Sequence, residues 1–121
     1  MKMEIADTAD GLVNVTLVGR LDTPAAERIE AELVASLVPR GARAIVDLSR
    51  LEFVGSMGLR MFITIARELD RNKGKLVLYS PQPWVNVMFT TAALHTIVSV
   101  RPDAASAAVT ARALGAAGAS A

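Results

Sequence analysis

The pattern of apolar runs in this 121-residue chain predicts a single α/β domain with a mixed, mostly parallel sheet. Three observations lead to this fold class. Short runs rich in Val, Ile and Leu alternate with longer segments of helical spacing. The first two runs flank a turn signal at Ala9-Asp10-Gly11, as in a β-hairpin. No internal repeat or linker divides the chain. We expect about five strands and about four helices, with the N-terminal hairpin as an antiparallel edge.

The first half of the chain contains the hairpin, one helix and one central strand. Residues 3–19 form the two hairpin strands, and the second of them alternates apolar and polar residues in part. A helix follows with Thr23 as its expected N-cap, because Pro24 suits the first helical position. The next strand is the apolar run 44–48, which is typical of a buried parallel strand.

The second half continues the alternation of helices and strands. A helix follows Ser56 directly, and we assign its core face to Leu59, Phe62, Ile63, Ala66 and Leu69. The later elements are a strand over 75–79, a helix running to about Ala92, a strand over 96–100 and an Ala-rich helix after 101–103. We expect the domain to span residues 1–114. Residues 115–121 should form a flexible tail, because they carry too little apolar bulk to order themselves.

Composition excludes several classes of protein. The formal net charge is +1, from 13 basic and 12 acidic residues, which argues against a direct nucleic-acid binder. No apolar run reaches the roughly 18 residues that a membrane-spanning helix needs, so we expect no membrane insertion. The N-terminus is acidic and alternating, unlike a signal peptide. We therefore expect a soluble cytoplasmic protein.

The residues that usually carry catalysis or bind metals are scarce. The chain has no cysteine, which excludes disulfides and thiolate zinc sites. His95 is the only histidine, and neither a carboxylate nor a second histidine stands near it in the sequence. No glycine–lysine phosphate loop and no local Ser–His–Asp grouping is present. We predict no catalytic residues, no metal site and no cofactor.

The stretch 44–62 leads a buried strand into a helix through Gly55-Ser56-Met57-Gly58. The Ser56 hydroxyl is thereby expected at a helix N-terminus, where free N–H groups and the helix dipole favour negative charge. A phosphate would add roughly 1.5 to 2 negative charges there and disturb a docked partner. We predict that Ser56 is phosphorylated and that Gly55, Met57 and Gly58 form its switch loop. The alternative is that Ser56 is only an N-cap.

Asp22 is the predicted acidic neighbour of Ser56. It follows the second strand, and the carboxyl ends of parallel strands lie along one edge of a sheet, where ligands gather. We therefore expect Asp22 beside the loop 49–56. The alternative is that Asp22 only caps the first helix.

Four residues of the helix after Ser56 are predicted to form a partner surface. They fall roughly opposite the expected core face and are Met57, Arg60, Met61 and Thr64. Exposed methionines suit a protein partner, because flexible thioethers adapt to varied surfaces. The alternative is that Met57 and Met61 flank the core. Trp84 follows Pro83 at a helix start, a position typical of a core or rim residue.

With these residues identified, the chain resembles the STAS domain (sulfate transporter and anti-sigma-factor antagonist) in its stand-alone bacterial form. The resemblance covers nearly the full length. It rests on four segments: 17–22, which matches a strand ending in Gly-x-Leu-Asp; 45–54, the Asp-Leu-Ser segment before the switch; 55–59, where the family has Asp-Ser-Ser/Thr-Gly-Leu; and 74–81, the next strand and helix entry.

The resemblance implies an anti-sigma-factor antagonist that is not an enzyme. Such a protein binds an anti-sigma factor that is also a serine kinase of the GHKL type, and this binding frees a sigma factor. The kinase then phosphorylates the serine at the helix start, which is Ser56 here, and the antagonist is released. A PP2C-like phosphatase restores the serine. By position, Asp22 is the acidic neighbour.

Two residues depart from the family pattern. Gly55 replaces the usual aspartate before the phosphoacceptor, and Met57 replaces the following serine or threonine. An alternative function is therefore a constitutive STAS interaction subunit of a transporter or signalling assembly, which is not phosphorylated. A nucleotide-binding domain or an enzyme is a third class. The missing phosphate loop and the missing paired carboxylates argue against it.

Overall fold

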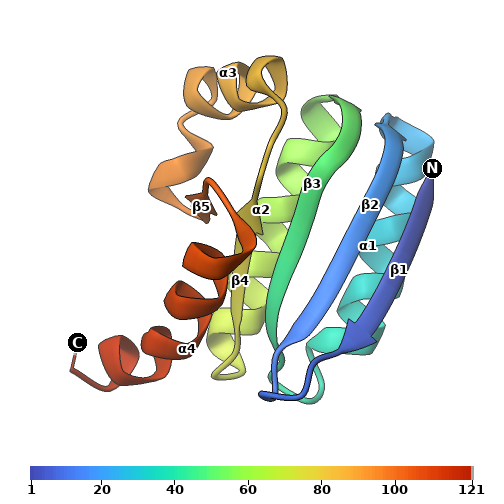
Figure 1. Cartoon of the computed structure of the whole chain (residues 1–121). Coiled ribbons are helices and arrows are strands. Elements are labelled where there is room, and N and C mark those ends of the chain that lie inside the picture. Colours follow the sequence, from blue (N-terminus) through green and yellow to red (C-terminus); the bar gives the residue numbers. More distant parts are fainter. Residues whose placement is uncertain (121) are drawn as a thin grey trace.

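A five-stranded sheet forms the middle layer of the molecule, with strand order β1-β2-β3-β4-β5 (Figure 1). β1 and β2 pair antiparallel as a hairpin, and all other neighbours are parallel. The strands are β1 (Lys2–Asp7), β2 (Val13–Leu21), β3 (Arg43–Val54), β4 (Lys75–Tyr79) and β5 (Ser99–Arg101). The predicted fold class, a mixed and mostly parallel sheet with an N-terminal hairpin, is confirmed.

Four helices and one short 3-10 turn connect the strands. They are α1 (Thr23–Leu37), α2 (Ser56–Arg71), α3 (Pro83–Thr91), the turn η1 (Leu94–Thr96) and α4 (Ala104–Ser120). The computed structural model describes the backbone of residues 1–120 and the side chains of residues 1–113. The predicted tail over 115–121 lies outside the fully described residues and stays a prediction.

The two faces of the sheet are covered differently. α1 and α2 lie against one face, where Leu, Ile, Val and Phe side chains form the larger core (Figure 1). α4 lies against the other face, over β3, β4 and β5. There the small residues Ala107 and Ala111 pack on Ile45, Val77 and Tyr79. α3 lies beyond the carboxyl end of β4, beside the last residues of β3 (Figure 1).

The structure corrects three predicted boundaries. β3 extends to Val54 instead of ending at residue 48, so it reaches almost to α2. The strand expected over 96–100 is shorter, because a left-handed residue at Ala93 (φ 55°) starts the turn η1 and delays β5 to Ser99. The N-cap of α1 is Asp22 and not Thr23, since the Asp22 carboxylate accepts the Ala25 amide at 3.1 Å.

The buried face of α2 also differs from the predicted one. Its fully buried residues are Gly58, Met61, Phe62, Ile65 and Leu69. Leu59, Ile63 and Ala66 were expected in the core, but they are only partly buried and pack on its margin. α2 contacts α1 as well as the sheet, and this second contact rotates the buried stripe by about one position.

Gly58 allows α2 to approach the sheet closely. A Cβ at this position would lie 2.8 Å from Leu21 Cδ2 and 2.8 Å from Val54 Cγ2, and both side chains are fully buried. We expect Gly58→Ala to lower the free energy of unfolding by about 1–3 kcal/mol, because overpacking outweighs the better helix propensity of alanine. Urea denaturation measures this change. The matched control is Gly55→Ser, where the added Cβ meets only ordinary contacts. Equal stability of the two variants would contradict the close-approach argument.

α4 begins at a carboxylate cap that titrates. Asp103 accepts the Ser106 amide at 2.8 Å and the Ser106 hydroxyl at 2.7 Å, and these bonds hold the pKa of Asp103 below its ordinary value of 3.8. Because the pKa is lower in the folded state, the cap stabilises α4 above about pH 4 and is lost as the pH falls through the folded pKa. The pKa of Asp10 is also lowered, chiefly by the Thr8 hydroxyl and also by Arg112 of α4. Its contribution to stability is therefore lost in acid as well.

We therefore expect the stability of the protein to fall in acid, with α4 loosening from the sheet. Asp103→Asn keeps an acceptor oxygen but removes its titration, so its urea midpoint should decline less steeply below about pH 4 than that of the wild type. Identical acid profiles for the two proteins would exclude Asp103 as a contributor.

Candidate functional site

The carboxyl ends of β2 and β3 meet at the start of α2. The Gly55 N–H donates to the Leu21 carbonyl at 3.0 Å, which joins the last residue of β2 to the loop after β3. Asp22 and Ser56 each follow this hydrogen-bonded pair by one residue. Both are exposed. The hydrogen bond therefore brings the two residues singled out in the sequence to the same edge of the sheet.

The N-terminus of α2 has no side-chain cap. Gly55 is the N-cap residue, with φ −93° and ψ −179°, and Ser56 is the first helical residue. The first intrahelical bond runs from the Leu59 N–H to the Gly55 carbonyl at 3.1 Å. The amides of Ser56, Met57 and Gly58 precede it and have no partner within the helix. The alternative in which Ser56 is itself the N-cap is wrong.

Gly55 is not required by the backbone. Its φ of −93° suits any residue. A Cβ added there would lie 3.4 Å from Phe53 Cε2 and 3.8 Å from the Leu21 carbonyl oxygen. An aspartate at this position would fit with little adjustment, so sterics do not explain the missing carboxylate.

Asp22 has a structural role in addition to its place beside the loop. Its Oδ1 accepts the Ala25 amide at 3.1 Å, and its carbonyl accepts the Ala26 amide at 2.8 Å, so it caps α1. The predicted capping of the first helix by Asp22 is thus confirmed, and its role as the acidic neighbour of Ser56 stays a prediction. Asp22 also borders an open recess of about 590 Å³, together with Arg20 and Arg28.

The predicted partner surface on α2 is only partly exposed. Arg60 is exposed, and Met57 and Thr64 are half-buried. Met61 has no exposed surface, and its assignment to a partner surface was wrong. The rotation of the buried stripe places Met61 in the core beside Phe62. Of the two methionines, only Met57 remains near the surface.

A cluster that the sequence did not reveal lies next to the loop. Arg20 and Phe53 are partners in the β2–β3 register, and the Arg20 guanidinium carbon lies 4.4 Å from the centre of the Phe53 ring. The ring of Trp84, from the first turn of α3, lies 6.1 Å from that of Phe53 at an angle of 34°. Trp84 is 41% exposed, so of the two expected positions, core or rim, it occupies the rim. We call Arg20, Phe53 and Trp84 the aromatic stack.

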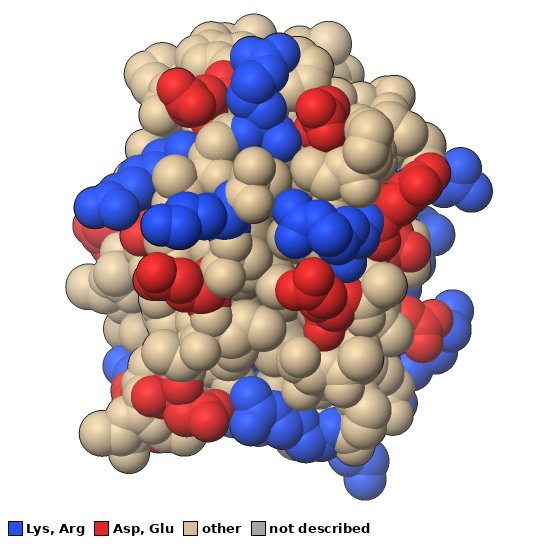
Figure 2. All heavy atoms as spheres, turned by 90° about the vertical axis from the view of Figure 1, so that its right-hand side faces the viewer, with Lys and Arg blue, Asp and Glu red and all other residues tan. Residues whose placement is uncertain are grey.

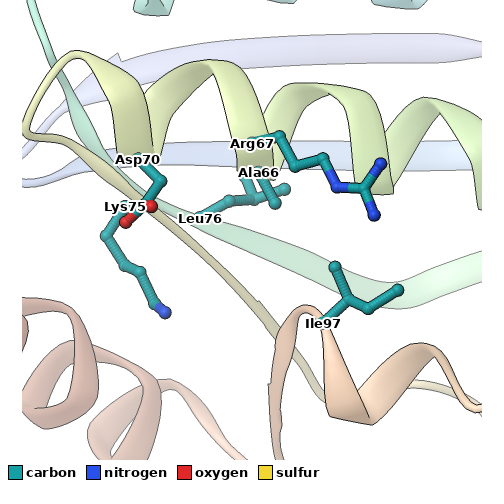
Figure 3. A pocket seen from close by; sticks show the side chains of 6 residues that line it. All are labelled: Ala66, Arg67, Asp70, Lys75, Leu76 and Ile97. Atoms are coloured by element: carbon teal, nitrogen blue, oxygen red, sulfur yellow. The ribbon is translucent and has the colours of Figure 1, made fainter.

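One recess away from this edge of the sheet is too small for a small-molecule site. A recess of about 170 Å³ lies between α2, β4 and the residue after η1 (Figure 3). Arg67 lines it from α2, Lys75 lines it from β4, and Ile97 lies across from α2 (Figure 3). Its volume is below the roughly 300 Å³ at which small-molecule sites begin. Within the described residues, no group of three potential metal ligands is close enough to hold an ion.

Charges on the face formed by β1 and α1 are mixed in sign. Figure 2 shows Lys and Arg side chains interspersed with Asp and Glu across this face, without a continuous basic stripe. A nucleic-acid interface normally needs such a stripe. Across the described part of the chain, no helix combines the length and the apolar character needed to span a bilayer.

Comparisons by sequence and by structure both find STAS domain proteins or anti-sigma factor antagonists. The STAS domain family model matches residues 4–107. The putative anti-sigma factor antagonist BtrV of Bordetella bronchiseptica is 35% identical over 94 residues, which cover 78% of this chain and 81% of BtrV. The anti-sigma factor antagonist SpoIIAA in its unphosphorylated form is similar in structure, with a TM-score of 0.68 and 25% identity over 94% of this chain and 99% of SpoIIAA.

A second solved structure is the phosphorylated form of the Bacillus cell fate determinant SpoIIAA. It matches with a TM-score of 0.63 and 26% identity, over 82% of this chain and 90% of SpoIIAA. The family model spans most of this chain, and BtrV is 35% identical over more than two thirds of both chains. This chain belongs to the STAS domain family.

Proposed function

We propose that this protein is an anti-sigma factor antagonist whose binding is switched off by phosphorylation of Ser56. The observation that carries the proposal is the exposed Ser56 hydroxyl on the uncapped first turn of α2. The relatives support it, because BtrV and SpoIIAA are described as anti-sigma factor antagonists. SpoIIAA has also been solved in a phosphorylated form.

The partner is an anti-sigma factor that is also a serine kinase of the GHKL type. The unmodified antagonist binds it in the cytoplasm and frees a sigma factor, and a PP2C-like phosphatase reverses the phosphorylation. In this scheme the chain is a binding protein and a kinase substrate, and it performs no catalysis itself. The predicted switch loop is Gly55 together with the first turn of α2, which contains Met57 and Gly58, and Arg60 and Thr64 border the docking surface.

The charge of a phosphate explains how a small modification releases a large partner. A phosphate on Ser56 adds roughly 1.5 to 2 negative charges at neutral pH. Within the domain, the free amides of the first turn and the helix dipole stabilise this charge. A partner packed over the serine would instead have to desolvate it, next to the carboxylate of Asp22. The domain therefore tolerates the phosphate, whereas the complex does not.

A second function is favoured by one specific observation, the replacement of the family's usual aspartate by Gly55. In that case the protein is a constitutive subunit of a transporter or signalling assembly and is not phosphorylated. Co-purification separates the two functions: a GHKL-type kinase supports the first, and transporter subunits without a kinase support the second.

Phosphorylation of Ser56 is tested by incubating the protein with its co-purifying kinase and ATP. We expect intact-mass analysis to show one added phosphate, and peptide mapping to locate it on Ser56. Ser56→Ala should accept none, whereas Ser36→Ala, which alters an exposed serine on α1, should behave like the wild type. A phosphate on any other residue would refute the proposed switch.

Ser56→Asp separates switching from unfolding. An acidic residue in the first turn of a helix typically stabilises it by about 0.3–1 kcal/mol, so the urea midpoint should stay equal or rise. Binding to the anti-sigma factor should weaken by about tenfold or more, because a charge is buried at the interface. Calorimetric titration measures the binding. If Ser56→Asp binds as tightly as Ser56→Ala, charge at this position does not control the complex.

A further inference from the structure

The aromatic stack lies in direct contact with the switch loop. A Cβ on Gly55 would touch the Phe53 ring at 3.4 Å, and Gly55 immediately precedes Ser56. The Phe53 ring in turn lies 4.4 Å from the Arg20 guanidinium carbon and 6.1 Å from the Trp84 ring. The surface around Ser56 therefore continues through Phe53 onto α3, and not only along the outer face of α2.

The α3 end of this surface is unusually apolar. Trp84 is 41% exposed and Val87 is 62% exposed, and their spacing of three residues places them on the same face of the helix. The other large apolar residues exposed in the described part of the chain are separated: Ile5 lies on β1, Ile97 follows η1 and Val109 lies on α4. Among residues 1–113, whose side chains the structure describes, α3 is the helix that exposes two of them.

The stack is held in place before any partner arrives. The Gln82 side-chain amide donates to the Ser49 carbonyl at 3.1 Å, which fixes the start of α3 to β3. Arg20 and Phe53 are held by the paired strands β2 and β3. A partner that docks on preorganised side chains loses less conformational entropy, and Trp and Arg are the residues that most often dominate binding energy.

The charge of Arg20 indicates what a partner should bring. Within the residues that the structure describes, the Arg20 guanidinium forms no salt bridge, and it lies beside the Phe53 ring next to Trp84. A carboxylate from a partner can approach Arg20 while an apolar side chain covers Trp84 and Val87. The complementary surface is thus acidic and apolar.

We propose that the aromatic stack, extended by Val87, is the anchor on which the anti-sigma factor kinase docks beside Ser56. This inference rests on the proposed function. The kinase contributes an apolar side chain to Trp84 and Val87 and a carboxylate to Arg20. The anchor holds the kinase near the serine and takes no part in phosphoryl transfer. Removing it therefore weakens binding and raises KM, and leaves kcat unchanged.

The test uses the full chain and its purified kinase, with Trp84→Ala and Arg20→Gln as variants. We expect Trp84→Ala to weaken binding by about tenfold or more and Arg20→Gln by less, with KM for Ser56 phosphorylation rising in proportion. Val87→Glu serves as a second variant, because its exposed position allows folding and its charge repels the expected carboxylate. The matched control is Val109→Ala, which removes an exposed apolar side chain on α4 and should bind like the wild type.

Three results would overturn the anchor, and each can be told apart from the others. If Trp84→Ala and Val87→Glu bind and react like the wild type while Ser56→Asp fails to bind, the anchor is wrong and the proposed function stands. If the wild type neither binds the kinase nor accepts phosphate, the proposed function fails and the anchor fails with it. A fall in kcat with unchanged KM would also contradict an anchoring role.

Discussion

The junction between the end of β2 and the start of α2 is the constraint on which the site depends. The Gly55 N–H donates to the Leu21 carbonyl, and Gly58 lies so close to the side chains of Leu21 and Val54 that a Cβ there would meet each at 2.8 Å. These contacts fix the first turn of α2 against the core. As a result, Ser56 is exposed at a fixed position on the first turn of α2, as the proposed switch requires.

The same end of the sheet carries two surfaces of different character. On one side of Ser56, the first turn of α2 offers backbone amides and the dipole of the helix. On the other side, Phe53 connects the loop to the exposed face of α3. One surface suits an added anion, and the other suits an apolar protein contact. The proposed switch requires both properties close together, and the two surfaces adjoin at Gly55.

Much of the fold follows from the sequence because it is encoded locally. The alternation of apolar strands and helices, the hairpin turn and the Gly55–Gly58 loop all lie within short windows of the chain. The buried face of α2 was not predictable in the same way, because its rotation depends on α1 as well as on the sheet. Met61 was therefore assigned to the surface when it lies in the core.

The aromatic stack could not be predicted from the sequence for a related reason. Arg20, Phe53 and Trp84 are distant in sequence, and they meet only through the β2–β3 register and the position of α3. β3 also continues to Val54, beyond the apolar run that marks its start, and this extension carries Phe53 to the loop. The neighbourhood of Asp22 and Ser56 was predictable, since it follows from the direction of parallel strands alone.

The central claim is that the uncapped first turn of α2 accommodates a phosphate on Ser56 without refolding the domain. Amide NMR spectra of the unmodified and phosphorylated protein test it most directly. The account predicts large shifts for the amides of Ser56, Met57 and Gly58, with the resonances of β3 and β4 in the core nearly unchanged. Shifts that spread through the core, or first-turn amides that do not respond, would contradict it.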